Sequence, residues 1–102
     1  MAHNTRWTIR PAARADLANI WQEGASSWGA AQADRYADSL FALFNLLVEF
    51  PDLAPERPEF APPVRIHPIS AHLVIYRAQR EGIDVIRVLH ARQELTAFLF
   101  DG

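Results

Sequence analysis

Residues 73–89 read Leu-Val-Ile-Tyr-Arg-Ala-Gln-Arg-Glu-Gly-Ile-Asp-Val-Ile-Arg-Val-Leu. Two apolar runs, 73–78 and 83–89, flank four residues that end in a glycine. Short apolar runs on either side of a glycine-containing turn are typical of a β-hairpin. A third apolar run, 64–69, precedes them. We therefore predict a three-stranded antiparallel meander.

The residues before this meander predict two helices. Over residues 12–26 apolar side chains recur every three or four positions, as on one buried stripe of a helix, and Pro11 suits its start. Residues 30–50 carry a broader apolar face, and Gly29 suits the turn between the two helices. We expect an antiparallel hairpin packed against a sheet. The stripe of the first helix comprises Ala13, Leu17, Ile20, Trp21, Gly24 and Trp28. The face of the second comprises Ala33, Tyr36, Ala37, Leu40, Leu43, Phe44, Leu47 and Phe50.

Three further segments complete the predicted fold. Trp7 to Arg10 alternates apolar and polar residues, which indicates an N-terminal strand. Residues 51–63 hold five prolines and are expected to be a crossing loop, neither helix nor inner strand. Residues 93–100 fit either a last strand or a short helix. The prediction is one α+β domain over residues 1–102, with a helical hairpin on one face of a small sheet whose opposite face is partly open.

Composition narrows the range of functions. The net charge of -2, from 12 acidic and 10 basic residues, gives no positive field for general nucleic-acid binding. The chain has no cysteine, which excludes disulfides and thiolate chemistry, and all its basic residues are arginines. Without an apolar leader or a run of about 18 apolar residues, a cytoplasmic protein is expected.

Groups that exchange protons or carry charge concentrate in the C-terminal half. They are Arg65, His67, His72, Tyr76, Arg77, Arg87, His90 and Arg92. His67 and His72 have no third ligand at metal-site spacing, and no serine stands in a nucleophile elbow. We expect no catalytic residue, metal or cofactor.

Strand alternation separates the two groups of greatest interest. It places Arg87 on the same face as Val85 and Leu89. It places His90 with Ile86 and Val88 on the other face. A catalytic pair is therefore not expected. Arg87 has two interpretations, a structural ion pair or an anchor for a partner's carboxylate, and His90 is interpreted chiefly as a hydrogen-bonded histidine at a strand end.

Aromatic residues offer the one positive sign of a binding surface. Trp21 and Trp28 fit the seam of the helical hairpin, but partly exposed they would mark a groove for a partner. The same alternatives apply to Phe98 and Phe100 near the C-terminus.

Several segments of the chain, taken together, resemble one known family. Its most specific part is Val85-Ile86-Arg87-Val88-Leu89-His90-Ala91-Arg92-Gln93, similar to the pattern I-x-R-V-L-H-x-R, where x is any residue. The weaker segments are Arg10-Pro11-Ala12-Ala13, Asp16-Leu17, Ile20-Trp21, Trp28-Gly29, Gln32-Ala33, Tyr36, Phe50-Pro51, Arg65 and residues 72–77. On these residues the chain resembles the RelE/ParE superfamily of toxins of type II toxin–antitoxin systems.

The resemblance implies a toxin neutralised by a cognate, ParD-like antitoxin in a hetero-oligomer, which meets operator DNA only through that antitoxin. ParE-like members bind DNA gyrase, whereas RelE-like members cut messenger RNA on the ribosome with lysines, arginines and often a C-terminal tyrosine. The absence of lysine, and of tyrosine after Tyr76, favours the gyrase-binding branch; an endoribonuclease is the alternative. The residues expected to contact the antitoxin or the target are Trp21, Trp28, Arg65, Tyr76, Arg77, Arg87, His90, Arg92, Phe98 and Phe100.

Overall fold

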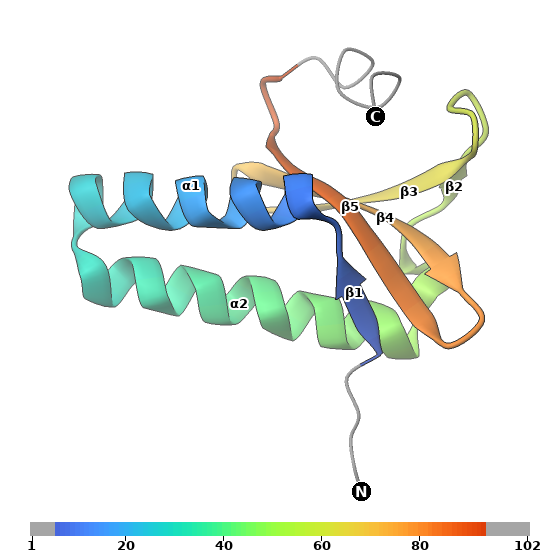
Figure 1. Ribbon diagram of the computed structural model, residues 1–102, viewed down its shortest axis with the longest axis horizontal. Coiled ribbons are helices and arrows are strands. Elements are labelled where there is room, and N and C mark those ends of the chain that lie inside the picture. The colour runs from blue at the N-terminus through green and yellow to red at the C-terminus, as the bar shows by residue number, and fades with distance from the viewer. Residues whose placement is uncertain (1–5, 94–102) are drawn as a thin grey trace, which may run out of the picture.

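The computed structural model describes residues 6–93, and these form two helices and one sheet (Figure 1). The helices are α1 (Pro11–Trp28) and α2 (Ala30–Glu49), followed by a short 3-10 helix, η1 (Pro51–Leu53). The strands are β1 (Trp7–Ile9), β2 (Glu56–Arg57), β3 (Val64–Ile69), β4 (His72–Gln79) and β5 (Gly82–His90). The predicted helical hairpin, N-terminal strand and three successive strands are therefore confirmed within a residue or two at most ends.

The sheet is larger than the predicted meander and is not purely antiparallel. Its order is β1-β5-β4-β3-β2, with β1 parallel to β5 and all other neighbours antiparallel. The expectation of a bare crossing loop over residues 51–63 was wrong, because this segment contains both η1 and β2. Strand β2 is an edge strand of two residues between prolines, and an edge position tolerates the missing proline amides.

A single residue joins the two helices. Gly29 has φ of 96°, a conformation that glycine adopts without the steric cost of a side chain, and its amide donates to the Ala25 carbonyl. The first helix therefore continues to Trp28, two residues beyond the predicted end. Figure 1 shows that the Gly29 end of the hairpin projects past the sheet.

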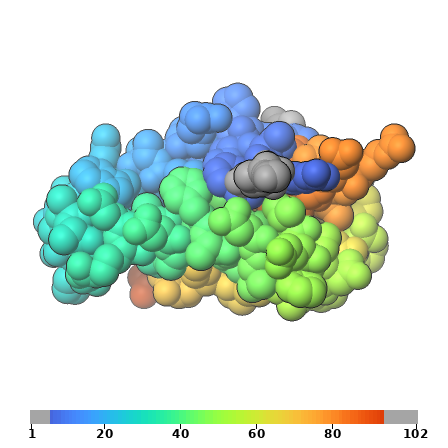
Figure 2. Space-filling view, turned by 90° about the horizontal axis from the view of Figure 1, so that it is seen from below, coloured from blue at the N-terminus to red at the C-terminus, as the bar shows by residue number. Residues whose placement is uncertain are grey.

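The main core lies between the helices and one face of the sheet. Its fully buried centre is Phe44 of α2, which packs with residues of β4 and β5, and Trp7 of β1 closes one side. The buried members are Ala13, Leu40, Leu43, Phe44, Leu47, Ala54, Val74, Tyr76, Ile83, Val85 and Val88. Figure 2 shows α2 extending along the surface of the molecule when it is seen from below.

The opposite face of the sheet was predicted to be partly open, but much of its apolar surface is buried. It carries a second apolar cluster in which Ile75 and Leu89 are 0% and 1% exposed. Phe60, from the proline-containing segment before β3, packs into this cluster with Val64 and Ile86. A segment without regular structure thus supplies an apolar side chain to this face, which its proline content alone did not indicate.

A bulge corrects the predicted faces of β5. Tyr76 lies opposite Val85 whereas Ile75 lies opposite Arg87, so Ile86 has no partner of its own in β4. An extra residue reverses the alternation beyond it. Val85 and Val88 consequently pack on the helical side, and Ile86 and Leu89 in the second cluster. The predicted faces were therefore wrong for the two residues at the bulge: Val85 does not share a face with Leu89, and Ile86 does not share one with Val88.

Neither described helix is long and apolar enough to cross a membrane.

Candidate functional site

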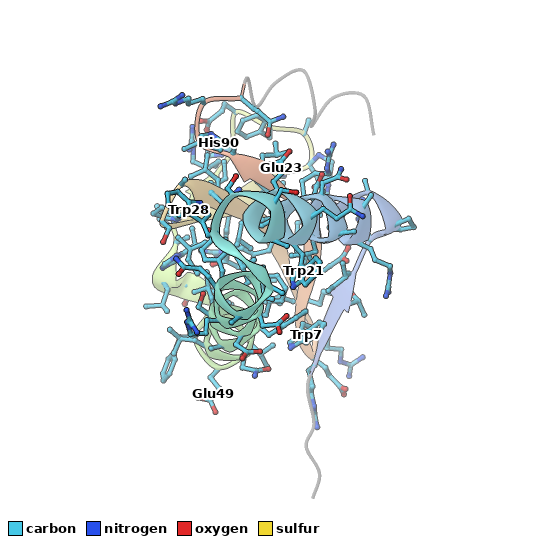
Figure 3. All side chains as sticks on the ribbon, turned by 90° about the vertical axis from the view of Figure 1, so that its left-hand side faces the viewer. Trp7, Trp21, Glu23, Trp28, Glu49 and His90 are labelled. Atoms are coloured by element: carbon cyan, nitrogen blue, oxygen red, sulfur yellow. The ribbon has the colours of Figure 1, made fainter. Side chains whose placement is uncertain are left out.

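One cavity lies under the projecting end of the hairpin. It has a volume of about 640 Å³ and is bounded by α1, α2, the β3–β4 turn and the end of β5. Figure 3 shows Trp28, Glu23 and His90 at this end of the molecule, with Trp21 and Trp7 on the other side of the hairpin. The lining residues are Ile20, Glu23, Gly24, Ser27, Trp28, Gln32, Ala33, Arg35, Tyr36, Ser39, Ser70, Ala71, His72 and His90. We call this cavity the hairpin pocket.

A tyrosine and a histidine are joined by a hydrogen bond in the hairpin pocket. The hydroxyl oxygen of Tyr36 lies 2.7 Å from Nδ1 of His72 and 3.2 Å from the carbonyl oxygen of Ile69. A phenol has one proton to donate. The arrangement that satisfies both contacts has Tyr36 donating to Ile69 and His72 donating from Nδ1 to Tyr36, and we assign the tautomer on that ground.

His90 lies beside His72 because the two residues are paired in the register of β4 and β5. Their rings meet edge to face with centroids 5.4 Å apart. Nδ1 of His90 accepts from the Arg92 amide at 3.2 Å, and the His90 amide donates to Oε1 of Gln93 at 2.8 Å. These contacts fix the orientation of the His90 ring at the rim of the pocket.

Burial keeps two groups of the hairpin pocket uncharged at neutral pH. Desolvation, reinforced by His90, lowers the pKa of His72 below 6.5, and the carboxylate of Glu23 opposes that shift. Desolvation raises the pKa of Tyr36 above 10.0, against a hydrogen bond from Ser70. Tyr36 and His72 are therefore neutral hydrogen-bonding groups in the pocket at neutral pH.

We expect acid to destabilise the fold through His72. A histidine whose pKa is lowered by folding binds a proton more readily when unfolded, so stability is complete above pH 6.5 and falls as the pH drops toward the folded pKa. Urea unfolding at pH 7.5 and pH 5.0 should show a smaller loss of free energy for His72→Gln than for the unmodified chain. Equal losses in both proteins would contradict the assignment.

A second, narrower groove runs between the two helices on the side of Trp21. Leu17 and Trp21 of α1 face Ala37, Leu40 and Phe41 of α2 across a cavity of about 230 Å³. Trp21 is 37% exposed and Phe41 is 36% exposed. The indole nitrogen of Trp21 donates to Oδ1 of Asp34 at 2.8 Å, and Phe41 stacks on Trp7 with ring centroids 5.6 Å apart. We call this surface the interhelix groove.

Trp28 corrects the prediction of one buried stripe along α1. Its side chain is 74% exposed, because the end of the hairpin extends beyond the sheet that would have covered it. The interpretation of Trp21 and Trp28 as partly exposed residues is therefore the one the structure confirms. They lie on different sides of the hairpin (Figure 3).

Arg87 forms an ion pair within the fold. Its Nε and Nη2 atoms donate to the two carboxylate oxygens of Asp16 at 2.7 and 2.8 Å. The same carboxylate accepts the amide of Val88 at 2.9 Å. Hydrogen bonding to Asp16 raises the pKa of Arg87. Of the two interpretations of Arg87, this geometry supports the structural ion pair. The pair joins α1 to the segment of β5 that follows the residues paired with β1.

The other predicted residues of β3 and β4 have different surroundings. Arg65 donates to the Ala54 carbonyl at 2.7 Å and lies 3.6 Å from Asp52, which fastens the loop after η1. Tyr76 is 0% exposed and donates to the Pro51 carbonyl at 2.7 Å. A partner that docks on the folded chain would not reach Tyr76.

Arg77 and Arg92 complete the predicted residues that the structure describes. Within residues 6–93, Nε of Arg77 is buried without a hydrogen-bond partner, and Arg77 lies opposite Asp84 in the sheet. Arg92 is exposed and follows the last strand. Phe98 and Phe100, and all but the first residue of the segment 93–100, lie outside the described residues.

The sequence did not indicate what three residues of these sites do. Asp16 and Tyr36 entered only through the family resemblance and the apolar face of the second helix, and Glu23 not at all, since their partners lie on strands more than thirty residues away. His72 was considered as a titratable group and as a metal ligand, and in the described part of the chain no three potential ligands gather. The pairing of His72 with His90 follows from strand register, which the bulge in β5 obscured.

The fold and these surfaces define a class of small α+β domain with a helical hairpin over a mixed sheet. A solved structure described as a chromosomal ParDE TA system from P. aeruginosa shares this fold, with a TM-score of 0.71 and 19% sequence identity over 87% of this chain and 98% of that one.

Sequence comparison identifies the family. Residues 8–95 match the family described as ParE toxin of type II toxin-antitoxin system, parDE. The chain is 33% identical to Toxin ParE1 of Mycobacterium tuberculosis (strain CDC 1551 / Oshkosh) over 93 residues, which cover 90% of this chain and 95% of the relative. It is 32% identical to Toxin ParE1 of Caulobacter vibrioides (strain ATCC 19089 / CIP 103742 / CB 15) over 87 residues, covering 85% and 90%. The chain belongs to the ParE toxin family of type II toxin–antitoxin systems.

Proposed function

We propose that this toxin arrests growth by binding DNA gyrase in the cytoplasm, without catalysing a reaction, and that a ParD-like antitoxin neutralises it by occupying the interhelix groove. Membership of the ParE family supports the toxin and antitoxin roles. The observation that carries the binding mode is the exposure of aromatic side chains on a hairpin that projects beyond its sheet. Exposed tryptophans are common anchors of protein interfaces.

The interhelix groove has the shape and chemistry for an amphipathic helix. Two antiparallel helices leave a furrow between them, and here its walls are apolar except for the indole N–H of Trp21. That N–H already donates a hydrogen bond to Asp34. A partner helix places apolar side chains into such a furrow at intervals of three or four residues. Burial of the second apolar cluster on the other face of the sheet supports the hairpin, rather than that face, as the antitoxin's docking surface.

Trp28 is the residue we propose for the gyrase contact. It is the most exposed of the large apolar side chains of residues 6–93, and it stands on the side of the hairpin away from Trp21. Both tryptophans lie on one short hairpin. An antitoxin bound in the interhelix groove would therefore obstruct a target as large as gyrase without touching Trp28.

A crossed pair of variants tests this assignment. We expect Trp21→Ala to weaken antitoxin binding by about 30-fold, the loss typical of an interface anchor worth about 2 kcal/mol, and to leave gyrase inhibition intact. Trp28→Ala should show the opposite pattern. Calorimetry with the antitoxin and a supercoiling assay measure the two effects. Equal effects of both variants on both partners would contradict the assignment of Trp21 to the antitoxin and Trp28 to gyrase. Because Trp21→Ala also removes the hydrogen bond to Asp34, thermal unfolding of each variant checks that the fold is intact.

Expression of the unmodified toxin alone tests the target. Gyrase poisoning predicts filamentous cells and a DNA-damage response while messenger RNA stays intact. Purified toxin should inhibit supercoiling by purified gyrase, and the antitoxin should restore it. Fully active gyrase would overturn the proposal, and rapid cleavage of translated messenger RNA would establish an endoribonuclease instead.

A further inference from the structure

The hairpin pocket contains two ring nitrogens that the fold itself does not use. Nδ1 of His72 is bonded to Tyr36, and Nδ1 of His90 is bonded to the Arg92 amide. Within residues 6–93, neither Nε2 atom has a hydrogen-bond partner in the structure. Neither of them is among the buried atoms left unpaired, a set that contains only Nε of Arg77 for this part of the chain. Both Nε2 atoms are therefore accessible.

The two nitrogens have complementary roles. Because His72 donates from Nδ1, its Nε2 in the neutral ring is an acceptor. Because Nδ1 of His90 accepts the Arg92 amide, the neutral ring carries its proton on Nε2 and donates from there. An acceptor and a donor thus stand side by side on rings whose centroids are 5.4 Å apart.

The surroundings favour a neutral ligand with an apolar body. Ile20, Ala33 and Trp28 provide apolar walls, and the volume of about 640 Å³ is that of a small-molecule site. The charged side chains that line the pocket are Glu23 from α1 and Arg35 from α2, one acid and one base. A formally charged ligand would meet one group of its own sign as well as one of the opposite sign, and its desolvation would be costly.

We propose that the hairpin pocket is a binding site for a neutral carboxamide attached to an apolar or aromatic group. The amide nitrogen donates to Nε2 of His72, and the amide carbonyl accepts from Nε2 of His90. The apolar group lies against Ile20 and Trp28. This site shares Ile20 and Ala33 with the interhelix groove but lies on the side of His72 and His90, and the proposal does not depend on gyrase being the target.

Such an amide has two possible sources, a free small molecule or an asparagine or glutamine side chain of a bound protein. Benzamide supplies the shared chemistry and serves as the probe. Once its binding is established, adding the antitoxin distinguishes the sources: displacement of benzamide assigns the pocket to an antitoxin side chain, and simultaneous binding assigns it to a free ligand.

The test is a titration of the full chain, followed by NMR of the tryptophan indole and histidine ring signals. We expect benzamide to bind at millimolar concentration and to shift the signals of Trp28, His72 and His90. Benzoate and benzylammonium have the same size and opposite charges, and each should bind at least tenfold more weakly. Equal binding of benzoate and benzamide would overturn the proposal.

Variants and pH provide independent readouts. His90→Phe keeps a flat ring in a half-buried position and should weaken benzamide at least tenfold, and His72→Phe should do the same. Trp21→Ala, outside the pocket, should not. Should His72→Phe fail to fold, the unmodified chain still provides the test.

The pH gives a second readout through His72, which faces Glu23, Arg35, Tyr36 and His90. Protonation of His72 turns its Nε2 atom from an acceptor into a donor. The affinity for benzamide should therefore fall about tenfold per lost hydrogen bond as the pH drops below 6.5 and His72 is protonated. Unchanged affinity across the pH range in which the His72 ring signals titrate by NMR would contradict the assigned roles.

Discussion

Replacing Asp16 with alanine is expected to lower the free energy of unfolding by about 3 kcal/mol. The carboxylate receives two hydrogen bonds from Arg87 and one from the Val88 amide, and its side chain is 13% exposed. Alanine would leave a mostly buried guanidinium without this partner and an amide unpaired at the edge of β5. Chemical unfolding of the variant and the unmodified chain measures the difference.

Asp16→Asn is the matched control for that variant. Its side-chain oxygen can still accept the Val88 amide, so we expect about half of the loss seen for alanine, with the remainder reporting the charge. If Asp16→Ala changed the free energy of unfolding by less than 1 kcal/mol, the fastening of α1 to β5 would have to come from apolar packing alone.

Phe44→Ala is the second large expected effect, with a loss of about 3–5 kcal/mol. Phe44 is 0% exposed and meets Trp7 and Phe41 edge on, so truncation removes apolar contacts at the centre of the core and leaves a cavity. At about 4–8 °C for each kcal/mol in a domain of this size, the midpoint of thermal unfolding should fall by more than about 12 °C.

Phe41 provides the comparison three residues away on the same helix. It is 36% exposed and stacks on Trp7, so Phe41→Ala should cost only about 1 kcal/mol. A similar loss in both variants would show that the groove side of α2 stabilises the fold as much as the core side does. That result would weaken the proposal that the interhelix groove binds the antitoxin.

The two surfaces of the hairpin have different origins. The interhelix groove follows from the sequence of the helices alone, because Trp21 and Phe41 flank the line along which any antiparallel hairpin of these residues would pack. The hairpin pocket requires the sheet, since Tyr36 meets its partners only where α2 crosses the β3–β4 turn. A change in the angle between hairpin and sheet would abolish the pocket and keep the groove.

Residue type alone did not show whether a predicted binding residue contacts a partner or the rest of its own chain. A guanidinium in an apolar strand indicated an anionic partner, and for Arg87 that partner is Asp16 of the same chain. Arg65 likewise fastens its own loop, and Tyr76 is in the core. Exposure rather than residue type separates these three from Trp28 and Arg92, which remain free to meet another protein.

The sequence by itself determined the helical hairpin, the N-terminal strand, the three successive strands, the turn at Gly29 and the resemblance to RelE/ParE toxins, because periodicity, turn chemistry and motifs are local properties. Tertiary structure alone decided that the N-terminal strand joins β5 in parallel, that Phe60 packs on the second face, and that Trp28 lies beyond the sheet. It also decided that His72 stands beside His90 and that Asp16 binds Arg87. Each of these contacts joins residues far apart in the chain, and register, bulge position and hairpin angle are set by how whole elements pack together.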